Sequence, residues 1–185
     1  MSSLRRVVVT GGPGSGKTSL LDALGADGVA TSPEAGRKII RHQVRIGGQG
    51  LPWVNPALFA ELMLQHELEA YEAATASGAG TVIFDRGVPD VAGYLRLCGL
   101  TVPPHIEQAA QDCRYDLIFI APFWPEIFTQ DKERKQDLKE AKSTSEVMAA
   151  TYGRLGYRVI ELPKVSVAER VAFLRTHLKE TFGEG

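Results

Sequence analysis

Residues 11–18 form the segment that most constrains the fold, and they read Gly-Gly-Pro-Gly-Ser-Gly-Lys-Thr. The segment matches the pattern GxxxxGK[ST] in full. An apolar β-branched run, Val7 to Val9, precedes it, and a helical pattern starts at Lys17. Glycines permit backbone angles that other residues rarely adopt, so successive amide N–H groups can turn toward an anion. The start of the following helix adds a partial positive charge. This combination predicts a phosphate-binding loop between a strand and a helix.

The residue types in this loop predict how it would bind a nucleoside triphosphate. We expect the ligand to be ATP, with Mg²⁺ as its counter-ion. The lysine should reach the β- and γ-phosphates, and the threonine hydroxyl should ligate the metal. The alternative is a glycine-rich turn without a ligand, but strand, loop, lysine, threonine and helix all stand in the register that binding needs. The predicted binding residues are Gly11, Gly12, Pro13, Gly14, Ser15, Gly16, Lys17, Thr18 and Ser19, with Thr18 also a metal ligand.

Short β-branched runs alternate with longer helical patterns along the chain, as in a parallel sheet covered by helices on both faces. The length predicts a single domain over residues 1–185. Right-handed crossovers then predict a three-layer α/β fold: a doubly wound, five-stranded parallel sheet with the P-loop NTPase topology and a helical lid. The expected strands cover residues 5–10, 28–31, 81–84, 116–120 and 157–162.

Capping residues and apolar periodicity predict the helices. Ser32-Pro33 and Asn55-Pro56 each place a capping side chain before a proline, which is favoured at the first helical position. The last helix should turn Val167, Val171 and Leu174 inward. The expected helices cover residues 17–24, 33–46, 56–75, 89–97, 104–113, a charged stretch from 130 that continues to about 155, and 166–178.

Charge and composition narrow the classes of partner. The net charge is -1, whereas a protein that binds nucleic acid usually carries a strong basic excess, so we expect no nucleic-acid partner. No apolar run reaches the length of a membrane span, and the N-terminal residues are too few to form a signal peptide before the first strand, which favours a cytoplasmic protein. The two cysteines have no spacing typical of a metal site. The oligomeric state stays open.

A carboxylate and an arginine follow the third expected strand. Asp85 ends the apolar run 81–84, where P-loop NTPases need an acid that holds Mg²⁺ through water. A turn-forming aspartate before Gly87 is the alternative. Arg86 comes next and could clamp a phosphate or a developing negative charge with two hydrogen bonds, although a plain salt bridge is also open.

With these residues the chain resembles P-loop kinases of the nucleoside and nucleotide kinase type. Asp85-Arg86-Gly87 is similar to the Asp-Arg motif of thymidylate kinases and the Glu-Arg motif of deoxynucleoside kinases. The sequence is more similar still to an AAA-labelled ATPase family that includes the ribosylnicotinamide kinase domain of NadR-type proteins. That likeness covers nearly the whole chain and is carried by residues 10–18, by Glu34-Ala35-Gly36-Arg37 and by Asp85-Arg86-Gly87 with Asp90 and Tyr94.

The resemblance implies a phosphoryl acceptor site beside the loop. In such kinases a glutamate after the second strand can take the proton of the acceptor hydroxyl, which assigns that role to Glu34. Arg37 lies three residues later on the same helical face and could orient a polar acceptor. The helix dipole alone also favours an acid in a first helical turn, and this is the alternative explanation for Glu34. Asp90 and Tyr94 are further acceptor candidates, whereas Trp53 and Phe59 are more typical of packing.

A highly charged segment lies between the fourth and fifth expected strands, where such kinases carry a lid. We expect the lid over residues 126–150 and expect its closure to bring Arg134, or Lys135, onto the phosphates. Closure would exclude water, which favours transfer of the phosphoryl group over hydrolysis. The alternative is a solvated helix held by pairs of opposite charge.

Together these features predict an ATP-dependent phosphotransferase, or an ATPase, that acts on a small hydroxyl acceptor. Lys17, Asp85, Arg86, Glu34 and Arg134 would form its catalytic set, and Thr18 and Asp85 its metal site. The resemblance implies a nucleoside-like acceptor. The competing hypothesis is a regulatory switch that binds and slowly hydrolyses ATP or GTP to control a protein partner.

Overall fold

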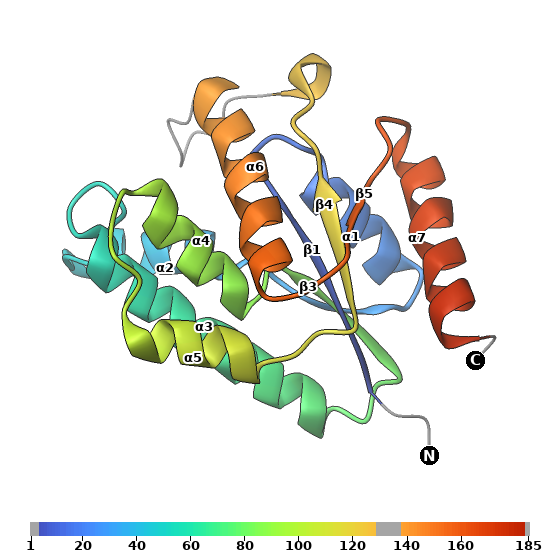
Figure 1. The fold of residues 1–185 in the computed structure, drawn as a ribbon, viewed down its shortest axis with the longest axis horizontal. Coiled ribbons are helices and arrows are strands. Elements are labelled where there is room, and N and C mark those ends of the chain that lie inside the picture. Colours follow the sequence, from blue (N-terminus) through green and yellow to red (C-terminus); the bar gives the residue numbers. More distant parts are fainter. Residues whose placement is uncertain (1–3, 129–137, 184–185) are drawn as a thin grey trace.

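The computed structural model describes residues 4–128 and 138–183, and a five-stranded parallel sheet forms its centre (Figure 1). The strands are β1 (Arg5–Gly11), β2 (Ala30–Ser32), β3 (Thr81–Asp85), β4 (Leu117–Ala121) and β5 (Val159–Glu161). Their order is β2-β3-β1-β4-β5, so the chain crosses over between neighbouring strands. The predicted fold class, a doubly wound five-stranded α/β sheet, is confirmed.

Helices connect the strands and cover both faces of the sheet. They are α1 (Lys17–Ala26), α2 (Ala35–Ile46), α3 (Pro56–Ala76), α4 (Val88–Leu97), α5 (Pro104–Asp112), α6 (Leu138–Arg154) and α7 (Val167–Phe182), with the short 3₁₀ helix η1 (Pro125–Ile127) after β4. The helices α3 to α6 lie on one face, and α1 and α7 lie on the other (Figure 1).

Strand β1 is buried on both faces because its side chains alternate between two cores. Val8 belongs to the core under α3 to α6, whereas Val7 and Val9 pack against α1 and α7. None of the three has measurable exposure, as expected for an inner strand of a parallel sheet. Because β1 pairs with β3 on one side and β4 on the other, the loop that follows β1 begins between the ends of these two strands.

The start of α2 differs from the prediction. Ser32 was expected to cap this helix, but it pairs with Phe84 and ends β2. The helix begins at Ala35 instead, and Glu34 occupies the capping position without a side-chain hydrogen bond to the helix backbone. Sheet pairing therefore overrides the local capping signal and places Glu34 at the junction of β2 and α2.

The last helix follows its local signals closely. Ser166 accepts a hydrogen bond from the backbone N–H of Glu169, and the Glu169 carboxylate accepts one in return from the backbone N–H of Ser166, which forms a capping box. Val171 and Leu174 are buried as predicted. The prediction for Val167 is wrong, because this residue in the first turn of α7 is 38% exposed.

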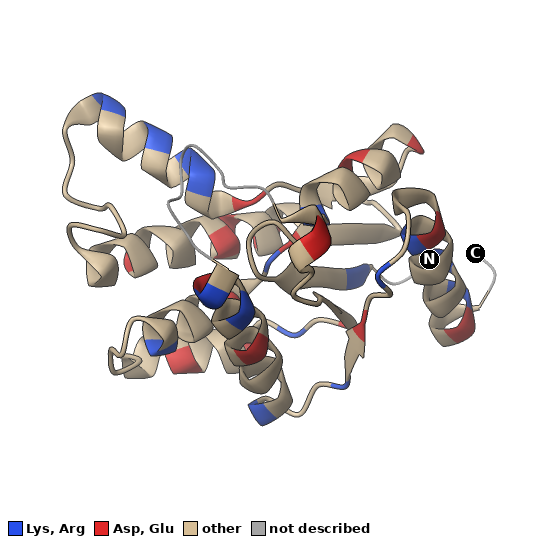
Figure 2. Ribbon diagram, turned by 90° about the horizontal axis from the view of Figure 1, so that it is seen from above, with Lys and Arg blue, Asp and Glu red and all other residues tan. Residues whose placement is uncertain are grey.

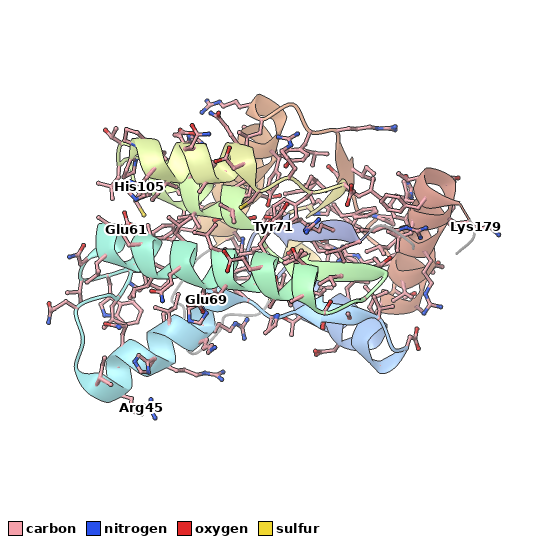
Figure 3. All side chains as sticks on the ribbon, turned by 90° about the horizontal axis from the view of Figure 1, so that it is seen from below. Arg45, Glu61, Glu69, Tyr71, His105 and Lys179 are labelled. Atoms are coloured by element: carbon pink, nitrogen blue, oxygen red, sulfur yellow. The ribbon has the colours of Figure 1, made fainter. Side chains whose placement is uncertain are left out.

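Helices α2 and the start of α3 extend away from the sheet and share a small core of their own, formed by Ala35, Ile39, Ile40, Leu51 and Phe59. Basic residues mark successive turns of α2 (Figure 2). Arg45 projects from the far end of α2, and His105 of α5 meets Glu61 of α3 on the opposite side (Figure 3). Among residues 4–128 and 138–183, no helix combines the length and hydropathy needed to cross a membrane.

The cap at Asn55 generates a first prediction. Its Oδ1 accepts a hydrogen bond of 3.0 Å from the backbone N–H of Leu58 at the start of α3. Replacing Asn55 by alanine should lower the free energy of unfolding by about 1 kcal/mol, which urea denaturation can measure. Asn55→Asp keeps the acceptor and serves as the control. Equal unfolding midpoints for Asn55→Ala and the wild type would contradict the assignment.

Candidate functional site

The glycine-rich segment forms a compact loop between β1 and α1. Gly11, Gly14 and Gly16 have φ angles of 134°, 67° and 81°, a region of backbone space that favours glycine. Gly16 is the residue before α1, so the loop ends at the N-terminus of that helix. The Ser15 hydroxyl donates to the Gly12 carbonyl over 2.7 Å and braces the turn. The glycines predicted from the motif therefore stand where the backbone geometry needs them.

Two of these glycines are also required by close packing. A Cβ atom on Gly11 would lie 2.4 Å from the carbonyl oxygen of Ala121 at the end of β4. A Cβ atom on Gly12 would lie 2.3 Å from the carbonyl oxygen of Ala141 in α6. The loop is thus seated against β4 and α6 with no room for side chains on that surface.

Lys17 points back along the loop. Its Nζ donates hydrogen bonds to the carbonyl oxygens of Gly12 over 2.8 Å and Gly11 over 3.3 Å. The side chain is buried, with 8% of the residue exposed. The ammonium group consequently lies over the turn rather than in bulk solvent.

Arg170 is a residue of the site that the sequence reasoning missed. It reaches from α7 beneath the loop, where its Nη1 donates to the Ser15 carbonyl over 2.7 Å and its Nε donates to the Pro163 carbonyl over 2.8 Å. Its guanidinium also lies 4.9 Å from the ring of Trp124. Arg170 therefore ties the loop to the turn after β5 and to the segment after β4. Its place on the inward row of α7, beside Val171, was the only signal in the sequence.

Asp85 ends β3 beside the loop, because it pairs with Val9 of β1. Only 8% of the residue is exposed, and within the described part of the chain its Oδ1 is buried without a hydrogen-bond partner. Burial raises the pKa of this carboxyl, and the positive charge of Lys17 acts in the opposite direction. An unpaired oxygen on a buried acid is what a metal-bound water or a cation would satisfy.

Arg86 follows in a strained conformation, with a φ of 76°. Its Nε donates to Glu34 and its Nη1 to Asp90, each over 3.2 Å. Burial by itself lowers the pKa of this guanidinium, but the nearby carboxylates of Glu34, Asp90 and Asp85 more than offset it and raise the pKa above its ordinary value. Arg86 is therefore a permanent, nearly buried cation that two side chains hold in one orientation. Strain of this kind is often stored at functional sites.

Asp90 holds Arg86 in place. Its Oδ1 accepts from the Thr10 hydroxyl as well as from Arg86. Its Oδ2 accepts from the Gly87 amide over 3.0 Å and from the Tyr152 hydroxyl over 2.6 Å. Both oxygens are thus engaged by the protein, so the structure favours a positioning role for Asp90 over the predicted contact with an acceptor.

Glu34 lies on the other side of Arg86. Its second oxygen is 3.3 Å from Nε of Arg37, so Glu34 and Arg37 form an ion pair, while their joint action on an acceptor stays a prediction. The structure therefore brings Lys17, Thr18, Asp85, Arg86 and Glu34 to one edge of the sheet, and two pockets border this group. Residue Arg134 lies outside the described residues.

The first pocket, of about 1020 Å³, lies between α2, α3, α4 and α6, with Glu34, Arg86 and Asp90 at its inner end. Three aromatic residues line it: Trp53, Phe59 and Tyr94. Phe59 and Tyr94 meet edge to face with ring centroids 5.4 Å apart, whereas Trp53 is 61% exposed. Glu67 of α3 also lines this pocket and is only 6% exposed.

The second pocket, of about 900 Å³, lies on the other side of α2. It extends from Thr18 and Asp85 along the basic residues of that helix, which are Arg37, Lys38, Arg41 and Arg45. The group formed by Glu34, Arg86 and Asp85 thus separates a pocket with several acids and aromatic rings from a pocket with a row of cations.

The predicted lid stays a prediction. Residues 129–137, which include Arg134, lie outside the described residues. Beyond them, residues 138–150 form the first turns of α6, where Ala141, Thr144, Ser145 and Met148 are buried. Before residue 129, the side chain of Phe128 packs beside Gly14, and the side chain of Ile127 packs beside Gly16. The segment that ends at Phe128 therefore rests on the loop.

Glu67 generates a prediction on stability. Burial raises its pKa well above 4.5, Asp90 adds to this, and Arg86 opposes it. The folded state therefore retains a proton that the unfolded state releases, so this contribution to stability is present below about pH 4.5 and is lost as the pH rises through the folded pKa. Urea unfolding of the wild type and Glu67→Gln should show the wild type losing stability relative to the variant as the pH rises from 4.5. Parallel pH profiles would rule this out.

Comparison with solved structures shows where else this fold occurs. The fold is similar to that of NadR protein in complex with NAD and AMP-PNP, with a TM-score of 0.74 and 18% identity over 98% of this chain and 50% of that chain. NadR protein in complex with NR gives a TM-score of 0.68 at 18% identity, over 98% of this chain and 51% of that one. The chain thus spans about half the length of these NadR chains.

A deoxyadenosine kinase from M. mycoides with bound dATP is similar over nearly its whole length. Its TM-score is 0.61 at 10% identity, over 95% of this chain and 99% of that chain. A search of curated protein sequences gave no match. Residues 6–170 match the family described as AAA domain (AAA_28). The chain therefore belongs to this AAA domain family, and its fold is that of the kinase-like P-loop NTPases.

Proposed function

We propose that the protein is an ATP-dependent kinase that phosphorylates a hydroxyl group of a small nucleoside-like molecule. One observation carries the proposal: the loop lysine, a buried acid with an unpaired oxygen, and a clamped arginine lie at one edge of the sheet, and the arginine lines a pocket large enough for a nucleoside. A pocket that is mostly apolar, with a few converging polar groups, is typical of small-molecule sites.

The loop residues 11–19 would hold the phosphates of ATP. Lys17 would exchange its bonds to the loop carbonyls for bonds to the β- and γ-phosphates. Thr18 and Asp85 would hold Mg²⁺, and the unpaired oxygen of Asp85 supports this assignment. Bound there, the ion would neutralise charge that develops on the phosphates.

Arg86 and Glu34 would act at the junction of the two substrates. The acceptor hydroxyl oxygen would form a bond to the γ-phosphorus while the bond from that phosphorus to the β-γ bridging oxygen breaks, which releases ADP. The hydroxyl proton would pass to Glu34. Arg86 would stabilise the charge on the transferring group, and its ion pairs with Glu34 and Asp90 support a preorganised orientation. Arg134 of the predicted lid would add a second cation.

The pocket charges favour a nucleoside over a nucleotide as acceptor. Besides Glu67, whose neutral form burial favours, three acids line the first pocket (Glu34, Asp90 and Glu140) against two basic residues (Arg86 and Lys139). Arg86 is already paired with two of these acids. A phosphorylated acceptor would meet a net negative wall, whereas a neutral or cationic ring with hydroxyl groups would not. Phe59, Trp53 and Tyr94 supply ring faces and edges for such a ligand.

The similar structures support the same reading. NadR protein has been solved with NR and with AMP-PNP, and deoxyadenosine kinase with dATP. Each therefore pairs this fold with nucleoside or nucleotide ligands. At identities of 10 to 18% the likeness extends to the fold, so the acceptor must be inferred from the pocket of this chain.

A regulatory switch is the second candidate, and one surface observation favours it. Five large apolar side chains are exposed near the tip formed by α2, the following loop and the start of α3: Val44, Ile46, Trp53, Val54 and Leu58. Exposed apolar patches often mark protein interfaces. Because Glu34 caps the start of α2 and also belongs to the group around Arg86, a partner bound to this tip could respond to the nucleotide.

ADP release from MgATP tests the proposal against the switch. Rates should be measured with and without nucleosides, nucleotides and other hydroxyl compounds, and product mass should confirm phosphate transfer. We expect a nucleoside to accelerate ADP release, and expect Lys17→Ala to abolish the acceleration because it removes the phosphate-binding ammonium. Tight ATP binding with a slow rate that no compound changes would instead favour the switch.

Gly12→Ala tests how the loop is seated. Its new methyl group would lie 2.3 Å from the Ala141 carbonyl, so loop and α6 must separate, at a cost of about 1–3 kcal/mol. ATP affinity, measured by calorimetry, should fall about tenfold or more. Gly153→Ala makes the same substitution within α6 and is the matched control, since no atom lies within 4 Å of its added methyl group. Unchanged ATP affinity in Gly12→Ala would contradict the seating of the loop.

A further inference from the structure

Glu67 is a buried acid that the proposed chemistry does not use. It lies in the middle of α3, one helical turn after Met63 and two after Phe59, on a row that is otherwise apolar. All three residues line the first pocket. Glu67 is 6% exposed, so its side chain lies in the wall of the pocket rather than at the mouth.

The Glu67 carboxyl has no hydrogen bond or ion pair with any residue of the described part of the chain. Its oxygens are not among the fully buried, unpaired side-chain atoms of the described residues, so they reach the surface of the pocket. A carboxyl in a mostly buried wall still loses part of its hydration without gaining a hydrogen bond from the protein, which costs free energy. An apolar residue on this row of α3 would avoid that cost. Glu67 therefore stabilises the folded protein less than a leucine or methionine at the same position would.

The neighbouring acids differ from Glu67 in this respect. Glu34 is paired with Arg86 and Arg37, and Asp90 accepts hydrogen bonds from Thr10, Arg86, Gly87 and Tyr152. Arg86 acts electrostatically on Glu67 but donates its side-chain hydrogen bonds to these two other acids. Among the three first-pocket acids Glu34, Glu67 and Asp90, Glu67 alone has no hydrogen bond or ion pair with the described part of the chain and can direct its carboxyl to a ligand.

The protonation of Glu67 defines what it could recognise. Burial raises its pKa well above the ordinary value, which favours the neutral acid. A neutral carboxyl presents one O–H donor beside one carbonyl acceptor. The matching ligand group is planar and also offers a donor next to an acceptor, as in a carboxamide or an amino-substituted ring nitrogen.

We propose that Glu67 determines acceptor specificity by making a paired hydrogen bond to a carboxamide or amino-heterocycle edge of the acceptor's ring. This inference rests on the proposed function, because it takes the first pocket as the acceptor site. The ring would lie among Phe59, Met63 and Trp53, while its sugar hydroxyl points to Glu34 and Arg86 at the inner end.

Two variants separate this role from a structural one. Glu67→Met removes the carboxyl and keeps the volume, whereas Glu67→Gln keeps a donor beside an acceptor. Thermal unfolding of the unliganded proteins should show a higher Tm for Glu67→Met than for the wild type, because a mostly buried carboxyl without a hydrogen bond from the protein is removed. A lower Tm for Glu67→Met would show that the carboxyl supports the fold and would overturn the inference.

Ligand selectivity is the second readout. Adenosine and purine riboside differ by the amino group alone, and nicotinamide riboside and pyridine riboside differ by the carboxamide alone. Calorimetry at saturating AMP-PNP should show the wild type binding one amino- or carboxamide-bearing compound about tenfold or more tightly than its partner, consistent with a paired hydrogen bond. Glu67→Met should lose that preference, Glu67→Gln should retain most of it, and AMP-PNP affinity should stay unchanged in both.

The outcomes distinguish this inference from the proposed function. Binding with the expected preference but without phosphate transfer from ATP would refute the kinase activity and keep the Glu67 contact. Phosphate transfer with the same preference in the wild type and Glu67→Met would refute the role of Glu67 and keep the kinase. Wild-type protein that binds none of the four compounds would overturn the inference.

Discussion

The buried guanidinium of Arg86 is the interaction on which the arrangement of the site depends. A cation in that position must be neutralised, and the carboxylates that do so come from the start of α2 and from α4. Asp90 in turn receives hydrogen bonds from Thr10 of β1 and Tyr152 of α6. One charge therefore links β3, α2, α4, β1 and α6 at the edge where the phosphate-binding loop begins. The strained φ of 76° at Arg86 is tolerated because these contacts hold the side chain from several directions.

The same network explains why two different pockets meet at one place. Glu34 and Arg86 lie between them, and α2 separates a pocket with excess acid from a groove with a row of basic residues. The overall charge of -1 conceals this division, because the opposite charges are distributed to the two sides of a single helix. The acidic pocket fits a neutral or cationic ring, and the basic groove begins at Thr18 and Asp85. Electrostatics in this protein is therefore a matter of local placement rather than of net charge.

Close packing against β4, α6 and Arg170 of α7 holds the loop in place. Gly11 and Gly12 allow the backbones of β4 and α6 to approach, and Arg170 connects the loop to the turns after β4 and β5. These contacts fix the loop on elements far apart in the sequence, which limits its freedom before any ligand binds. A preorganised loop of this kind loses less conformational entropy on binding. Glu67 illustrates the opposite compromise, because an acid without a hydrogen bond in the wall of the pocket lowers stability and adds binding capacity.

The sequence by itself determined what depends on neighbouring residues: the loop motif, the alternation of strands and helices, and the cap at Asn55. Hence the fold class and the position of Asp85 could be predicted, since β-branched runs and glycine spacing act locally. Only the tertiary structure decided what depends on contacts across the chain. Sheet pairing moved the start of α2 past Ser32, and the network around Arg86 engaged Asp90 fully. Arg170 and Glu67 gave no motif, because their environments are created by α7 reaching the loop and by α3 closing the pocket. Whether a side chain is buried, and which residues it contacts, depends on elements that are far apart in the sequence. Local sequence patterns could therefore not reveal these contacts.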